Sequence, residues 1–317
     1  MHASIVRCLR AAPVAERCAD AATFFARFRP AAARGGATID LAIDLGFAAD
    51  RVAWAFAGGY QAALRALVPD LAPDAIASLC VTEQGGNRPR HVQTTLTGDG
   101  AGGFVLDGYK RWTTLGPAST TLLVVARAGG SDDRPLLRVA RIDAHATGVT
   151  IERQPDTPFV PEVPHASVRL DQVRVAADAL LDGDGYERCV KPFRTIEDAH
   201  VTAAIVAYLL AEARRRAWPV AFRDRAVATL ASLRDAGADD PSSPETHAAL
   251  GGALAFALAL ARDADALFGD APGDAEAARF RRDAPLLSVA AVARARRSER
   301  AWERLEARLA ESPEGAR

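Results

Sequence analysis

The stretch from position 104 to 116, Phe-Val-Leu-Asp-Gly-Tyr-Lys-Arg-Trp-Thr-Thr-Leu-Gly, carries the strongest structural signal in this chain. It opens with the β-type run Phe104–Leu106, and the turn residues Gly98-Asp-Gly100 precede it. A tryptophan beside threonines in a strand usually packs in a core or on a sheet, and a ligand wall is the alternative for Trp112.

Similar short β-type runs continue on both sides of this stretch, from Ala77 to about Asp182. Turn residues such as Gly129-Gly130-Ser131-Asp132 separate them. Strands at this spacing predict an antiparallel sandwich or barrel. The other expected strands are Ser78–Thr82, Thr121–Ala126, Leu136–Ile142, Val149–Ile151 and Ser167–Leu170.

The flanking parts of the chain show helical periodicity. Residues 1–75 predict a small helical segment that Pro30 and Gly35-Gly36 break, and residues 183–317 predict a helical bundle, with Ser243 or Thr246 as a helix cap. Because no βαβ alternation occurs, we expect an α+β protein of three parts, 1–75, 76–182 and 183–317. The expected bundle helices are Thr195–Ala217, Val220–Arg234, Thr246–Phe268 and Pro285–Leu309.

Composition excludes several classes of protein. The 317 residues are 49% hydrophobic, and 39 Lys and Arg nearly balance 40 Asp and Glu, which argues against nucleic acid and anionic membranes as partners. No apolar run approaches a membrane span, and the first ten residues lack a secretory pattern, so we expect a cytoplasmic protein.

The four cysteines are scattered without CxxC spacing, at positions 8, 18, 80 and 189. Such spacing argues against a disulfide framework and a zinc site, and no other His, Cys and carboxylate pattern favours a metal. We expect buried or idle thiols and no metal.

Three motifs in the middle segment resemble those of the acyl-CoA dehydrogenase family. Cys80-Val-Thr-Glu83 with Gly85-Gly86 is similar to its Val-Thr-Glu-Pro-Gly-Ala-Gly-Ser-Asp turn, and the 104–116 stretch to its Leu-Asn-Gly-x-Lys-x-Trp-Ile-Thr-Asn-Gly. Val168–Val175 and Gly183-Asp-Gly-Tyr186 resemble its exit strand and following turn. The resemblance implies the family's fold, with this chain a short, divergent member whose C-terminal bundle is truncated.

The resemblance also implies FAD as cofactor and an acyl thioester, CoA-bound or carrier-bound, as substrate. A flavin needs an aromatic wall and a few aimed hydrogen-bond donors. These roles fall to Trp112, Thr114 and Thr82, with backbone contacts from Cys80 and Val81. Family members form homodimers or homotetramers, and the Ala/Leu faces of residues 203–210 and 250–260 suit such contacts; the sequence identifies no electron-transfer partner.

The chain departs from the family in the turn after Glu83. Asn87-Arg88-Pro89 replaces Gly-Ser-Asp, so a long cation stands where a short serine approaches the cofactor pyrophosphate. An arginine binds pyrophosphate bidentately, which makes Arg88 a candidate phosphate contact. The alternatives are that it blocks the pocket or lies in solvent.

The family's usual catalytic glutamate is absent. Arg282-Asp283-Ala284 resembles the family's Tyr-Arg-Asp-Ala, but Ala291-Val292 replaces the Glu-Gly that follows. Other members carry the base on the first helix of the third domain, within one position of Glu197. Burial against a flavin raises a carboxyl pKa, which suits a base. The alternative is a helix-start cluster in which Glu197 and Asp198 complement the helix dipole and pair with Arg194.

Two further polar groups have ordinary explanations. Glu162 and His165 precede a strand, but without a nucleophile motif they do not support a hydrolase. The basic run from Arg294 to Arg300 predicts a solvated helix face, salt-bridged by Glu299, Glu303 and Glu306.

Two functions stay open. The first is FAD-dependent α,β-dehydrogenation of an acyl thioester, with Glu197 as base. The second is a non-catalytic relative that keeps the scaffold to bind an acyl carrier or to pair with a full-length homologue.

Overall fold

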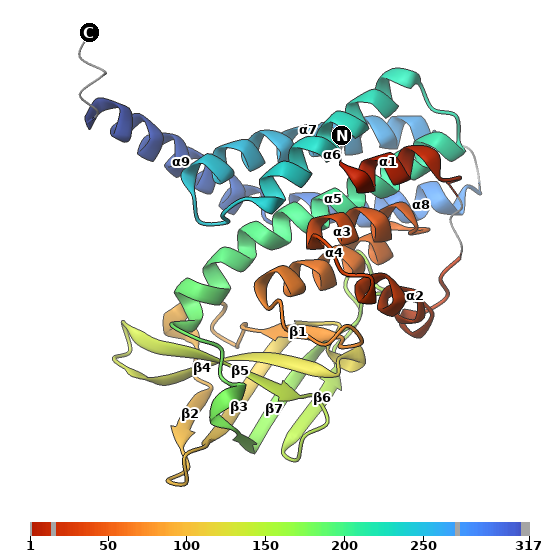
Figure 1. Cartoon of the computed structure of the whole chain (residues 1–317). Helices are drawn as coiled ribbons and strands as arrows, with labels where there is room; N and C mark the ends of the chain where they lie inside the picture. Colours follow the sequence, from red (N-terminus) through yellow and green to blue (C-terminus); the bar gives the residue numbers. More distant parts are fainter. Residues whose placement is uncertain (1, 14–16, 270–272, 312–317) are drawn as a thin grey trace.

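A computed structural model describes residues 2–13, 17–269 and 273–311. Helices lie on one side of a curled β-sheet (Figure 1). The N-terminal helices are α1 (Ala3–Arg10), α2 (Ala21–Ala33), α3 (Thr38–Phe47) and α4 (Val52–Leu67). Pro30 lies inside α2, so the predicted break there is wrong; it stands near the end of the helix, where few backbone bonds remain to be lost.

The C-terminal helices surround α5, whose residues 203–210 are all buried. They are α5 (Lys191–Arg215), α6 (Val220–Ala238), α7 (Pro244–Phe268), α8 (Ala275–Asp283) and α9 (Ala291–Glu311). Ser243 accepts the N–H of Thr246, so the predicted cap of α7 is confirmed. The helix expected from Pro285 begins at Ala291, because Ala284–Ser288 forms a 3-10 turn. The helix before this turn, α8, was not predicted from the sequence.

Glycines bring α3 and α4 unusually close to α5. A Cβ built on Gly46 would meet the carbonyl oxygen of Ala204 at 2.0 Å, and one on Gly59 would meet the Cα of Val201 at 2.7 Å. Only a residue without a Cβ permits this approach. Residues 203–210 are therefore covered by the chain's own helices, and the prediction that they form a subunit contact is wrong for that face.

The sheet lies between Ala77 and Val175. Its strand order is β1-β4-β2-β3-β7-β6, and β5 pairs with β4. Most pairs are antiparallel, but β1 and β2 each run parallel to β4. The strands are β1 (Ala77–Cys80), β2 (Thr95–Gly98), β3 (Phe104–Thr114), β4 (Thr121–Gly130), β5 (Pro135–Asp143), β6 (Val149–Arg153) and β7 (His165–Val175).

All four cysteines are buried and free, as predicted. In the described ranges, no helix is both long and apolar enough to cross a bilayer. The cytoplasmic location and the three domain boundaries stay predictions.

Candidate active site

A β-bulge turns the Trp112 indole out of the sheet. The β3–β7 register shifts between Lys110 and Thr113, and Trp112 has a backbone φ of 58°, which is rare for a bulky residue. Its side chain is 49% exposed. The indole borders a cavity of about 420 Å³, lined also by Tyr109, Arg111 and residues 152–158. Trp112 is thus presented to a ligand-sized space and is not a core residue.

A buried ion pair fixes the loop that leaves β1. Lys110 Nζ lies 2.6 Å from Glu83, and the lysine side chain is fully buried. Glu83 also accepts hydrogen bonds from the backbone of Gln93 and from the Thr94 backbone and hydroxyl. Burial raises the pKa of Glu83, but Lys110 and these bonds outweigh it and hold the pKa below its usual value. Both residues stood in the sequence motifs, yet their pairing was not predicted.

A hydrogen-bonded chain of side chains surrounds Thr114. Its hydroxyl lies 3.3 Å from Nε2 of His165, whose ring packs edge-on against Trp112. The Tyr60 hydroxyl accepts the N–H of Leu79 and also contacts the Thr114 side chain. Burial lowers the pKa of His165 and raises that of Tyr60, so both are neutral near pH 7. Sequence reasoning missed Tyr60 because it comes from α4, far from the motifs.

The other predicted flavin contacts lie next to these hydrogen-bonded side chains. Thr82 accepts the N–H of Arg111 through its carbonyl oxygen, which places the end of β1 beside the end of β3. Val81 and Thr82 are partly exposed, whereas the Cys80 side chain is buried and burial raises its pKa to about 11. Cys80 can therefore offer a ligand only its backbone.

Glu197 occupies a small cavity of about 130 Å³ between α4, α5 and the start of α9. Its neighbours there are largely apolar, among them Phe56, Val201 and Leu287. Burial and, to a lesser extent, the Asp198 charge raise the pKa of Glu197 to about 7, although the Arg294 charge lowers it. The negative charge of Glu197 also contributes to the raised pKa of Tyr60, so the two groups lie near each other.

The two adjacent carboxylates of α5 have different roles. Asp198 is paired with Arg294 and Arg297 of α9, and not with Arg194 as the alternative prediction supposed. Glu197 has no ion-pair partner in the described part of the chain, and it lies beyond the first turn of a helix that begins at Lys191. A carboxyl with this environment is poised to exchange a proton near pH 7.

Arg88 lies outside the Trp112 cavity. It lines a separate groove with the start of α5 and with α9. The structure thus places the end of β1, with Cys80, Val81 and Thr82, beside the end of β3, with Trp112 and Thr114, although only Trp112 of these five lines the cavity, and it sets Arg88 apart.

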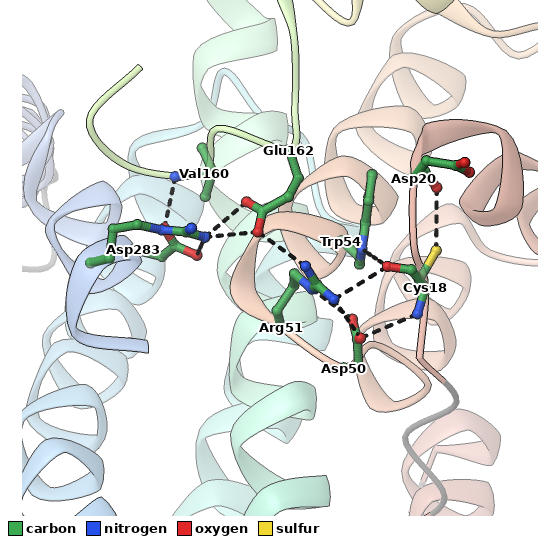
Figure 2. A network of polar contacts seen from close by, with 9 residues as sticks. Cys18, Asp20, Asp50, Arg51, Trp54, Val160, Glu162 and Asp283 are labelled. Atoms are coloured by element: carbon green, nitrogen blue, oxygen red, sulfur yellow. Dashed lines mark hydrogen bonds and ion pairs between the residues drawn. The ribbon is translucent and has the colours of Figure 1, made fainter. Parts of the chain in front are cut away.

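Glu162 and Asp283 belong to a structural network (Figure 2), and Arg282 forms ion pairs with both. Arg282 contacts Glu162 at 2.8 Å, Glu162 also contacts Arg51 at 3.1 Å, and Asp283 accepts the N–H of Val160. This network joins α8, the β6–β7 loop and α4. The fragment that resembled the family's Tyr-Arg-Asp-Ala therefore has a structural role in this chain.

Residues 78–173 match the family model of the acyl-CoA dehydrogenase middle domain, which is the sheet that carries the Trp112 bulge. This sheet is therefore similar to the middle domain of the acyl-CoA dehydrogenase family, and the chain spans less than half the length of the curated relatives it matches. It is 32% identical over 126 residues to the "Probable acyl-CoA dehydrogenase FadE10" of Mycobacterium tuberculosis, covering 38% of this chain and 19% of that protein. It is 29% identical over 157 residues to the "Benzylmalonyl-CoA dehydrogenase" of Aromatoleum aromaticum, covering 47% of this chain and 41% of that one.

The family fold extends well beyond the matched domain. The butyryl-CoA dehydrogenase of Megasphaera elsdenii superposes with a TM-score of 0.68 at 17% identity, over 85% of this chain and 86% of that one. A chain described as the electron transferring flavoprotein of Acidaminococcus fermentans gives a TM-score of 0.70 at 14% identity, over 94% of this chain and 95% of that one. At such identities these structures establish the fold alone.

The residues around Trp112 fit a flavin ring. The exposed indole offers an aromatic face, and the cavity beside it falls within the range of about 300–1,000 Å³ typical of cofactor sites. Gln154 also lines this cavity, and its buried side-chain oxygen has no hydrogen-bond partner among the described residues. An unpaired acceptor of this kind suits an N–H on the edge of a ring.

Proposed function

We propose that this chain is an FAD-dependent oxidoreductase of acyl-CoA dehydrogenase type, which forms an α,β-double bond in an acyl thioester. The observation that carries the proposal is the Trp112 indole, turned out of the sheet by a bulge and presented to the 420 Å³ cavity. We also propose that the substrate is bound to CoA or to a carrier, and that the protein forms a homodimer or homotetramer, as is usual in the family.

The chain's own residues would orient the cofactor. Trp112 would pack against the ring, while Thr82, Thr114 and the backbone of Cys80 and Val81 would hold its polar edge. When bound, the flavin supplies the acceptor for the hydride that leaves the β-carbon. Tyr60 and His165 hold the Thr114 hydroxyl in place, so it makes its contact without first reorganising.

Glu197 would remove the α-proton. With its pKa raised to about 7, a large fraction of the group is carboxylate at neutral pH and yet basic enough to accept a proton from a weak carbon acid. Most of the residues that line its cavity are apolar, which favours the neutral form of the carboxyl. Asp198 does not compete for this role because two arginines hold it.

The visible spectrum of the purified protein, alone and after addition of FAD, is the first test. Flavin absorbance with acyl-CoA-dependent bleaching is expected. Glu197→Gln should lower turnover with an artificial electron acceptor at least 100-fold and leave flavin uptake unchanged. The exposed Glu245→Gln on α7 is the matched control. A protein that takes up no flavin defeats the proposal.

A second candidate is a non-catalytic relative that keeps the scaffold as a binding or partner subunit. It is favoured by the internal use of Arg282 and Asp283, the one fragment that resembled a C-terminal family motif. Flavin uptake without turnover of any acyl thioester in a panel, and with Glu197→Gln indistinguishable from wild type, would support it.

A further inference from the structure

A cavity of about 130 Å³ lies where the segment before α2, the start of α4, the end of α5 and the helix α8 meet. Every residue that lines it is charged, and arginines outnumber carboxylates by four to two. We call it the four-arginine cavity. Its lining residues are Arg17, Asp50, Arg51, Arg215, Glu276 and Arg279.

On the α4 side of the cavity, the carboxylate is already paired. Arg51 lies 2.9 Å from Asp50 and 3.1 Å from Glu162 (Figure 2). Asp50 also accepts the backbone N–H of Cys18 at 3.2 Å. These contacts fix this wall and use the charge of Asp50 within it.

The carboxylate on α8 is held in a similar way. Arg215 and Arg216 both form ion pairs with Glu276. Burial raises the pKa of Glu276, but these two guanidinium groups outweigh it and hold the pKa below its usual value. Glu276 therefore stays ionised at neutral pH, and its charge is shared between two arginines.

The other two arginines of the cavity have no such partner. Neither Arg17 nor Arg279 forms an ion pair with any residue that the structure describes. The Nε of Arg279 is buried and donates no hydrogen bond within the same ranges. Buried donors almost always have an acceptor. A neutral acceptor would satisfy this one donor, whereas an anion would also offset the excess of positive charge.

The size of the cavity selects a small ligand. Liquid water takes about 30 Å³ per molecule, so the cavity has room for roughly four waters, or for one ion of the size of phosphate or sulfate. Pockets for cofactors span about 300–1,000 Å³, so a nucleotide is too large. The wholly charged lining also excludes an apolar chain.

We propose that the four-arginine cavity binds a small tetrahedral oxyanion, inorganic phosphate or sulfate. The guanidinium fork of arginine binds such an ion through charge-assisted, bidentate hydrogen bonds. Arg17 and Arg279 supply the unpaired positive charge, and the ion pairs of Arg51 and Arg215 fix the walls.

The bound anion would join distant parts of the chain. The residues that hold it come from the N-terminal helices and from α5 and α8, so binding favours the folded state over the unfolded chain. The cavity shares no lining residue with the Trp112 cavity or the Glu197 cavity. The inference therefore does not depend on the proposed function.

Thermal unfolding and titration calorimetry of the full chain with sodium phosphate test the proposal. Phosphate should bind with saturation at millimolar concentration and raise the unfolding midpoint above that in sodium chloride of equal ionic strength. Sulfate should act similarly. Saturation separates a site from the general stabilisation by phosphate and sulfate, which act by exclusion from the protein surface. Acetate that binds as tightly as phosphate would overturn the choice of a tetrahedral ion.

Arg279→Gln should weaken phosphate binding at least about tenfold, because it removes a charged donor. Arg17→Gln should weaken it at least about threefold, a smaller loss since Arg17 is exposed. The matched control is Arg223→Gln on α6. Arg223 is also half-buried and its Nε is also buried without a partner among the described residues, but it lies outside the cavity. This control should change binding less than about twofold.

Equal phosphate binding by Arg279→Gln and Arg223→Gln overturns the site, and so does the absence of saturable binding by wild type at millimolar concentration. In sodium chloride, Arg279→Gln should unfold at the wild-type midpoint or above it, because it removes an unpaired charge. If this variant does not fold, Arg17→Gln decides: binding equal to that of the control overturns the site, and weaker binding supports it. Flavin uptake is read separately from the visible spectrum, so failure of the site leaves the proposed function intact.

Discussion

The Trp112 cavity and the arginine groove, which is lined by Arg88, Arg194 and the arginines of α9, are built in different ways. The cavity is lined by β3, β6 and the loop after β6, and the buried Lys110–Glu83 pair holds β3 to the loop after β1. The groove is assembled from four segments, and its arginines are held by few internal contacts. The cavity is therefore suited to orienting a rigid ring, and the groove to attracting and holding a charged, flexible group.

Lys110→Met should cause a large loss of stability, because it leaves the Glu83 carboxylate buried without its ion-pair partner. Removing one partner of such a pair costs about 3–5 kcal/mol. Urea unfolding measures the loss. Lys191→Met, from the exposed pair at the groove, is the control and should cost about 0–1 kcal/mol. Similar losses for the two variants would contradict the contrast between a fixed cavity and an adaptable groove.

Two of the four tryptophans, Trp54 and Trp112, offer the next comparison. Trp54 is buried, stacks on Phe24 and donates to the carbonyl of Cys18, so Trp54→Ala should cost about 3–5 kcal/mol. Trp112→Ala removes an exposed side chain and should stay within about 0.5 kcal/mol of wild type. Thermal unfolding and FAD titration are the measurements. We expect Trp112→Ala to weaken FAD binding at least tenfold; a large stability loss would mean that the indole is a core residue.

Glu197 predicts a pH dependence of stability. Its folded pKa is about 7, above the unfolded value of about 4.3, so between these values the folded state holds more protons than the unfolded state. Its contribution is full below pH 4 and is lost as the pH rises through 7, by about 3 kcal/mol at about 1.36 kcal/mol per pKa unit. Urea unfolding at pH 5 and pH 8 should show this loss in wild type but not in Glu197→Gln. Parallel curves would show that the carboxyl is solvated.

The smallest effect is expected in the groove. Without ligand, Arg296→Gln/Arg300→Gln relieves like-charge repulsion and should raise stability by a few tenths of a kcal/mol at low salt. The gain should vanish at 1 M salt, where screening is complete within a few Å. Differential scanning calorimetry at two salt concentrations detects it. A loss of stability would mean that these arginines have structural partners.

The sequence by itself determined the class of fold and named the candidate residues near the sheet, whose role in binding stays a prediction. The Val-Thr-Glu and Trp-x-Thr motifs are local, and alternation along a strand is a property of adjacent residues, so both could be predicted. Buried thiols and the Ser243 cap followed in the same way. The sequence did not show which of the two carboxylates, Glu197 or Asp198, lacks an ion-pair partner. The reason is that the arginines that pair with Asp198 come from α9.

Only the tertiary structure decided the remainder. The parallel pairing of β1 and β2 with β4, the contact of Tyr60 with Thr114, and the gathering of Arg88 and Arg194 with the α9 arginines all join segments far apart in the chain. Spacing in the sequence reports on neighbours within one helix or strand. Charge neutralisation and side-chain orientation depend on which elements pack together, and glycines such as Gly59 allow that close packing.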